Sequence, residues 1–139
     1  MGMQAAIGQV WSARSPNGPR ALVFIFDLFE DCVEVALCHS FPELATDHDL
    51  ILPPTACGLP YTLVVETDIV GPILESQLHA CLGSLPTAIV PACWQGACTS
   101  PHLRGLPIQG RADARWGFKL TELERLHACC ASAMRRLLD

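Results

Sequence analysis

The feature that most constrains the fold is a series of short apolar runs in the first half of the chain, rich in β-branched and aromatic residues. Turn-forming residues separate these runs at close intervals, a pattern typical of small antiparallel β structures. The predicted strands are 8–11, 21–26, 32–38, 50–52 and 61–65, and the polar pair Thr67-Asp68 breaks the last run. A further run, 69–74, contains Gly71-Pro72 and is predicted as a short or bent edge strand. The sequence therefore predicts a small antiparallel barrel of five or so strands.

The segment after these strands has a helical period. Leu74, Leu78 and Leu82 repeat every four residues, and Gly83 follows the last of them. Glycine commonly ends a helix because it adopts the left-handed conformation without steric cost. This pattern predicts a short helix over 75–82.

The C-terminal segment carries a stronger helix signal. Thr121-x-x-Glu124 has the form of a capping box, in which each side chain satisfies an end amide of the helix. Apolar residues follow at three- and four-residue spacing: Leu123, Leu126, Cys130, Met134 and Leu137. This single stripe predicts an amphipathic helix over 120–138 that packs on the sheet or on a second subunit.

The length of 139 residues favours one domain, with a barrel core over 7–85. Between the core and the final helix, proline and glycine recur throughout 86–118, so long regular structure is not expected there. We predict a partly ordered insertion, packed on the barrel or on a partner, with room for one short strand.

Charge is distributed unevenly along the chain. The formal net charge is −5, and of the nine basic residues only Arg14 and Arg20 precede residue 104. Because polyanion binding depends largely on Lys and Arg at phosphates, the acidic β-rich body is predicted to suit nucleic acid poorly. The acidic segment 47–49 is interpreted as a solvated loop.

The chain shows neither a basic N-terminal region followed by a long apolar run nor an apolar run of the ~20 residues that cross a membrane. A cytoplasmic protein without a membrane partner is expected. The eight cysteines lie mostly in apolar segments, where reduced thiols behave as small hydrophobic groups.

One weak metal candidate lies in the insertion. Cys93, Cys98 and His102 could ligate zinc, with Cys81 or His79 as a fourth ligand. The spacing is not that of a common zinc module, and no Cys-x-x-Cys occurs. We therefore expect neither a metal nor a cofactor.

The order of several short motifs is the most specific signal in the sequence. Gly-x-Val-Trp at 8–11 is followed by Gly-Pro-Arg at 18–20, the strand ALVFIF, the segment VALCHS, the strand LVVETD and Leu-Gly-x-Leu at 82–85. In this order the motifs resemble the MazF/PemK family of toxin components, small SH3-like barrels related to CcdB. The resemblance covers roughly 7–85 and 119–138.

The resemblance implies a function and a set of residues. Many members of that family are ribonucleases that cut single-stranded RNA without a metal. Carried over by position, Arg20 stands near the family's arginine, Ser40 or alternatively His39 at its Thr/Ser, and Asp68 at its central aspartate. Glu66 stands where ribonucleases of the PemK kind have an arginine.

Two functions are therefore open. The first is a toxin component, either an endoribonuclease that uses Arg20, Ser40 and Asp68 or a toxin that acts by binding protein, with a small antitoxin as partner. The second is a non-enzymatic, homodimeric interaction module on the same barrel, which acts through the insertion and the C-terminal helix.

Overall fold

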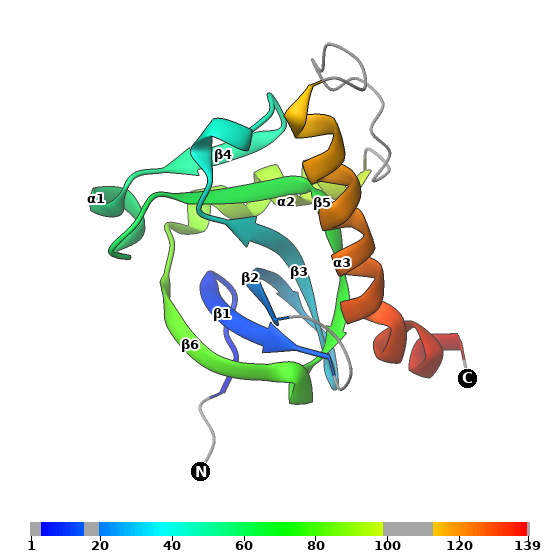
Figure 1. The fold of residues 1–139 in the computed structure, drawn as a ribbon. Coiled ribbons are helices and arrows are strands. Elements are labelled where there is room, and N and C mark those ends of the chain that lie inside the picture. Colours follow the sequence, from blue (N-terminus) through cyan, green and yellow to red (C-terminus); the bar gives the residue numbers. More distant parts are fainter. Residues whose placement is uncertain (1–3, 16–19, 99–112, 139) are drawn as a thin grey trace.

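The computed structural model describes residues 4–15, 20–98 and 113–138, except for the side chains of 96–98. Its strands are β1 (Gln9–Arg14), β2 (Arg20–Leu28), β3 (Cys32–His39), β4 (Asp49–Leu52), β5 (Leu63–Leu74) and β6 (Leu78–Ser84). Its helices are η1 (Pro42–Leu44), α1 (Pro54–Cys57), η2 (Glu75–Gln77), η3 (Thr87–Ile89), α2 (Val90–Cys98) and α3 (Ala114–Leu138). The predicted fold class, a mainly antiparallel β structure with a C-terminal helix, is confirmed (Figure 1).

The six strands form one curved sheet in the order β4-β5-β3-β2-β1-β6, and every neighbouring pair is antiparallel. β1, β2 and β3 follow one another as hairpin neighbours, as the turn residues between their apolar runs predict. The sheet is strongly curved, with β4 at one edge and β1 and β6 toward the other, and α3 lies along one side of the sheet (Figure 1). The strand ends that lie close to α3 form the region in which the candidate site is found.

Apolar side chains pack on both faces of the sheet. One cluster joins the sheet to α3; its buried members include Trp11, Val23, Val35, Ile73, Leu126 and Cys129. The second lies against α1, η3 and α2; its buried members include Phe24, Phe26, Cys38, Leu63, Ile89 and Cys93. The alternation of residues along each strand sorts them between the two clusters, because successive side chains of a strand point to opposite faces.

α3 and β5 approach each other closely at Gly71. An added Cβ at this glycine would lie 2.8 Å from Sγ of Cys130 on α3, well inside van der Waals contact. The interruption of the apolar run by Gly71-Pro72 is therefore where the helix packs directly on the strand.

The prediction of a separate edge strand over 69–74 was wrong. β5 is continuous from Leu63 to Leu74 and lies between β4 and β3. The register to β3 jumps from Ala36↔Val70 to Leu37↔Glu66, so residues 67–69 form a bulge in the place where the sequence predicts a break. Pro72 is tolerated because β4 pairs only with residues 63–66 of β5.

The prediction of a helix over 75–82 was also wrong. Only one 3₁₀ turn forms over Glu75–Gln77, and Leu78–Ser84 is the edge strand β6, which pairs with β1. Leu78 and Cys81 pack against the cluster beneath α3. The open edge of β1 and this apolar contact override the four-residue spacing of leucines, a common outcome for short segments.

The C-terminal helix is confirmed, but its start is not. α3 begins at Ala114, and the hydroxyl of Thr121 donates to the carbonyl of Gly117 within the helix instead of capping its end. Leu126 and Cys130 of the predicted stripe are buried, whereas Met134 and Leu137 are exposed.

The described part of the insertion contains a helix, and no strand forms between 86 and 98 or between 113 and 118. Pro91 lies in the first turn of α2, where a missing backbone N–H costs no hydrogen bond. Among the described residues, no helix combines the length and apolar character needed to cross a membrane.

Candidate functional site

A cavity of about 330 Å³ opens where the ends of β2 and β3 meet α3. Its lining consists of Ser12, Arg20, Ala21, Leu22, Cys38, His39, Ser40, Phe41 and Arg125. We call it the Arg20 cavity. It brings together three residues singled out in the sequence, Arg20, Ser40 and the alternative His39, and none of its lining residues is acidic.

Arg20 and Ser40 are placed at this cavity by the ends of two paired strands. Arg20 is the first residue of β2, and Ser40 directly follows the last residue of β3. Because β2 and β3 are antiparallel, the beginning of one strand lies beside the end of the other. Both side chains are solvent-exposed and therefore available to a ligand.

His39 forms a buried wall of the cavity. Its Nδ1 accepts a hydrogen bond from the backbone N–H of Phe41 at 3.1 Å, and its ring lies edge-to-face with Phe118, with centroids 4.7 Å apart. Its Nε2 lies 4.0 Å from Oε1 of Glu66. Burial, assisted by the charges of Lys119 and Arg125, lowers the pKa of His39 to about 4. His39 is therefore neutral at pH 7, and the bond to Phe41 assigns its proton to Nε2.

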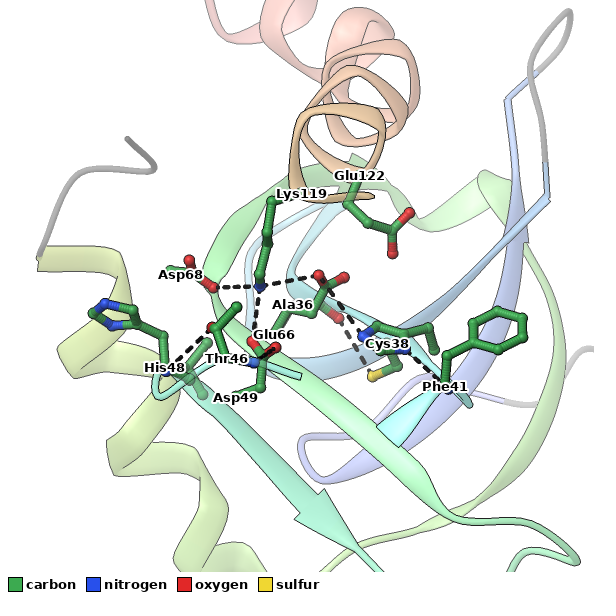
Figure 2. A network of polar contacts seen from close by, with 12 residues as sticks. Ala36, Cys38, Phe41, Thr46, His48, Asp49, Glu66, Asp68, Lys119 and Glu122 are labelled. Atoms are coloured by element: carbon green, nitrogen blue, oxygen red, sulfur yellow. Dashed lines mark hydrogen bonds and ion pairs between the residues drawn. The ribbon is translucent and has the colours of Figure 1, made fainter. Parts of the chain in front are cut away.

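Beneath α3, next to His39, lies a cluster of buried charges. Nζ of Lys119 donates to Oδ1 of Asp49 at 2.8 Å, to Oε1 of Glu66 at 3.0 Å and to Oδ1 of Asp68 at 3.0 Å. Figure 2 shows Lys119 reaching from α3 to these carboxylates. The three bonds use all the donors of one ammonium group. We call these four residues the Lys119 cluster.

The Lys119 cluster perturbs the protonation of its members. Burial raises the pKa of Glu66 well above its usual value; Lys119 opposes this rise and the neighbouring Glu122 carboxyl adds to it. Burial likewise raises the pKa of Asp49, against the effect of Lys119. Burial alone would lower the pKa of Lys119, but the carboxylates of Glu66, Asp49 and Asp68 raise it above its usual value. The ammonium ion thus stays charged.

The structure therefore separates the predicted site residues. Asp68 lies in the bulge of β5 and bonds to Lys119; it does not line the Arg20 cavity. The interpretation of 47–49 as a solvated loop was wrong for Asp49, whose side chain is fully buried. The acidic residues Asp49, Glu66 and Asp68 are paired in the interior, so they do not form a repulsive surface at the cavity.

Among the residues that the structure describes, one group of potential metal ligands lies beneath α3. Ligand atoms of His39, Asp49 and Glu66 all lie within 4.8 Å of one another. Nζ of Lys119 already contacts both carboxylates, so a metal ion would have to displace a buried ammonium. Cys93 is buried in the apolar cluster, and burial raises the pKa of its thiol to about 12, which keeps it protonated.

The other two zinc candidates are not described at the level of side chains. His102 and the side chain of Cys98 lie outside the described residues. The zinc hypothesis therefore gains no structural support from Cys93.

Lys119, Glu122 and Arg125 are the residues that sequence reasoning missed. All three lie on α3; Lys119 and Glu122 are buried, and Nε of Arg125 lies 3.4 Å from Oε2 of Glu122. A signal was present: Lys119 and Glu122 continue the spacing of Leu126 and Cys130 toward the N-terminus of the helix. The predicted helix, 120–138, begins one residue after Lys119 and so left it outside.

Comparison with solved structures identifies the fold. An endoribonuclease in complex with its cognate antitoxin, from mycobacterial species, has a TM-score of 0.54 and 16% identity over 70% of this chain and 94% of that chain. The toxin MazF-mt6 of Mycobacterium tuberculosis has a TM-score of 0.49 and 17% identity over 66% of this chain and 93% of that chain. Neither a protein-family model nor a curated protein sequence matches the chain.

The first of these similarities shows the fold. The protein thus belongs to a fold class in which a small curved antiparallel sheet is closed on one side by a C-terminal helix. The resemblance predicted from the order of the sequence motifs is confirmed at the level of the fold, which this chain shares with that endoribonuclease.

Proposed function

We propose that this chain is the toxin component of a toxin–antitoxin pair and a metal-independent endoribonuclease, with the Arg20 cavity as its active site. The observation that carries the proposal is the convergence of Arg20, Arg125 and Ser40 on one cavity without an acidic lining residue. Guanidinium groups are well suited to phosphate because they donate two hydrogen bonds in a fixed planar geometry. The fold shared with an endoribonuclease supports the same reading.

The chemistry needs little more than charge stabilisation and proton transfer. The 2′-hydroxyl of RNA attacks the adjacent phosphorus, the bond from phosphorus to O5′ breaks, and a cyclic phosphate and a 5′-hydroxyl remain. Negative charge builds on the phosphoryl oxygens, where Arg20 and Arg125 act as donors. The hydroxyl of Ser40 donates a hydrogen bond to the same group, and water in the open cavity takes and returns protons.

His39 is a positioning residue in this scheme. Its Nδ1 is occupied by the N–H of Phe41, and its Nε2 faces Glu66. Neither nitrogen is free to act as general base without a change of rotamer. By holding Phe41 and packing on Phe118, His39 fixes the wall of the cavity beside Ser40. Asp68 contributes through Lys119, which anchors the helix that carries Arg125.

The test is a cleavage assay on single-stranded RNA with sequencing of the 5′ ends of the products, with and without EDTA. We expect cleavage by the wild type that EDTA does not change, and a loss of about 10²–10³ in rate for Arg20→Ala. The matched control is Arg135→Ala, an exposed arginine on α3 that does not line the cavity. Absence of wild-type cleavage, or equal rates for the two variants, contradicts the enzymatic proposal.

We further propose a small antitoxin protein as partner, because the similar endoribonuclease is in complex with its cognate antitoxin. A homodimer and a cytoplasmic location belong to the same proposal. Induced expression should arrest growth, and co-expression of the protein encoded next to this one should relieve the arrest. Light scattering of the purified chain measures the oligomeric state.

A non-enzymatic interaction module remains the second candidate. The observation that favours it is Trp94 on α2, which is 43% exposed although its ring packs edge-to-face on the buried Phe26 at 5.2 Å. Exposed tryptophan is typical of binding hot spots. Growth arrest that persists in Arg20→Ala but disappears in Trp94→Ala would favour this candidate over the enzyme.

A further inference from the structure

A second cavity, of about 290 Å³, lies beside the end of β1. Its lining consists of Arg14, Ser15, Leu74, Ser76, Gln77, Leu78, His79 and Ser132. We call it the Arg14 cavity. It has a guanidinium group, three serine side chains and an imidazole, and none of its lining residues is acidic.

The floor of the Arg14 cavity is held rigidly. Gln77 is buried, and its amide nitrogen donates to the carbonyls of Cys129 at 3.0 Å and of Arg14 at 3.4 Å. Its Oε1 accepts the backbone N–H of Leu74 at 2.9 Å. One side chain thus ties the end of β1, the end of β5 and α3 together around the cavity.

Ser15 provides a polar group that lacks a partner. This residue is 6% exposed, and its buried Oγ has no hydrogen-bond partner among the described residues. A buried hydroxyl without a partner is destabilising, because it gives up its hydrogen bonds to water and gains none in the fold. Such a group calls for an explanation, and in the lining of the Arg14 cavity a bound ion or water would supply the missing partner.

The two cavities are neighbours. Arg14 and Arg20 are directly paired across β1 and β2, so each cavity has one member of the same cross-strand pair. On α3 they are lined by Ser132 and Arg125, which are seven residues apart. Seven residues are about two helical turns, so these side chains lie on the same face of the helix about 10 Å apart along its axis.

We propose that the Arg14 cavity binds the phosphate of a nucleotide flanking the cleaved one, so that a single RNA strand runs along α3 through both cavities. Arg14 and the serine hydroxyls contact the phosphate, and Leu74 and Leu78 contact the apolar side of a ribose or base. The inference rests on the proposed function for the identity of the strand.

This arrangement gives a common role to the only two basic residues that precede residue 104. In the sequence they appear isolated in an acidic region. In the fold they stand side by side at the point where the sheet meets the helix that carries Arg125. The result is a local row of cations in a chain whose net charge is negative.

The test measures binding separately from cleavage. The probe is a fluorescent, random-sequence, 2′-O-methyl RNA dodecamer, which lacks the hydroxyl that cleavage needs. Fluorescence anisotropy over a series of salt concentrations compares the wild type with Arg14→Gln, Ser132→Leu and Arg135→Gln. Ser132→Leu fills the cavity without changing the charge, and Arg135→Gln removes the same charge outside both cavities.

We expect Arg14→Gln to weaken binding about tenfold. The slope of log K against log salt should fall by about 0.7, which is the loss of one phosphate contact on a single strand. Ser132→Leu should weaken binding with an unchanged slope, and Arg135→Gln should bind like the wild type. Thermal unfolding of each variant verifies that it is folded. If a variant does not fold, His79→Gln takes its place, because His79 is an exposed residue of the same cavity lining.

The outcomes separate the two proposals. Equal binding by Arg14→Gln and Arg135→Gln, or no binding by the wild type, overturns the inference even if RNA is cleaved. Binding that depends on Arg14 without any cleavage of unmodified RNA supports the inference and removes the enzymatic function. For an active enzyme, Arg14→Gln should raise KM for long RNA and leave kcat unchanged.

Discussion

Nζ of Lys119 lies 2.8 Å from Oδ1 of Asp49, a residue 70 positions earlier in the chain. The pair joins the final helix to the edge strand β4, and two further carboxylates on β5 complete the contact. A buried ammonium held in this way sets both the position and the rotation of α3. The same helix carries Arg125 to the Arg20 cavity and Ser132 to the Arg14 cavity, so the Lys119 cluster positions one wall of both.

Replacement of Lys119 by methionine should destabilise the fold strongly. Lys119→Met leaves three buried carboxyl groups without the ammonium that contacts them, and removing one partner of a buried ion pair costs about 3–5 kcal/mol. Urea unfolding followed by circular dichroism at pH 7 measures the loss, with Arg135→Met as the exposed control on the same helix. A loss below about 1 kcal/mol would show that the cluster adds little to stability.

Protonation of His39 should destabilise the fold in mild acid. The pKa of His39 is about 4 in the folded chain and about 6.5 in the unfolded chain, so the unfolded state binds more protons between these values. The free energy of unfolding therefore falls as pH decreases from 6.5 to 4. After allowance for solvent screening, we expect an effect on the order of 1–2 kcal/mol.

Glu66 and Asp49 have the opposite effect on the free energy of unfolding between pH 6.5 and pH 4. The raised pKa values of Glu66 and Asp49 make the folded state bind more protons as pH falls toward 4, which stabilises it. The measurement is therefore a difference between wild type and His39→Gln in urea unfolding at several pH values. A difference that does not vary with pH contradicts the prediction.

Substitution of Gly71 by alanine should push α3 away from β5. The added Cβ would meet Sγ of Cys130 at 2.8 Å, and such overpacking costs about 1–3 kcal/mol. Cys130→Ala removes the sulfur, so the double variant should be more stable than the sum of the single losses predicts. Strict additivity in this double-mutant cycle would mean that the two side chains do not compete for space.

Loss of Arg125 should reduce RNA cleavage by more than the loss of its ion pair with the buried Glu122 lowers stability. Arg125→Gln removes a guanidinium from the cavity lining, and the loss of one donor to a developing charge lowers kcat by about 10²–10³. Arg135→Gln is the control for charge, and unfolding by urea is the control for structure. Cleavage by Arg125→Gln at the wild-type rate would exclude this residue from the active site.

Several sequence patterns determined local structure because the physics behind them is local. The alternating and continuous apolar runs gave β1 to β4 near their predicted positions, and the stripe around Leu126 gave the final helix. The patterns failed where a long-range contact decided the outcome. Leu78 and Leu82 have helical spacing, but β1 offers an open edge, and the segment forms a strand instead.

The residues of the candidate site also fall into two groups, those that local sequence patterns predict and those that only long-range contacts place. Arg20, Ser40 and His39 could be named from motif order, because strand ends that are adjacent in a hairpin are adjacent in space. Arg125 could not, because no local rule relates a helix near residue 125 to the start of a strand near residue 20. Asp68 matched a motif by position, yet its bulge directs it to Lys119.

The sequence by itself determined a small antiparallel sheet, a terminal amphipathic helix and an order of motifs that fits the observed fold. Only the tertiary structure decided which charges are buried and which face a cavity. Asp49, Glu66 and Asp68 look like a repulsive acidic surface in the chain, but they surround one ammonium in the interior. The physical reason is that burial of charge depends on a partner, and these partners are 51 to 70 residues apart in the chain.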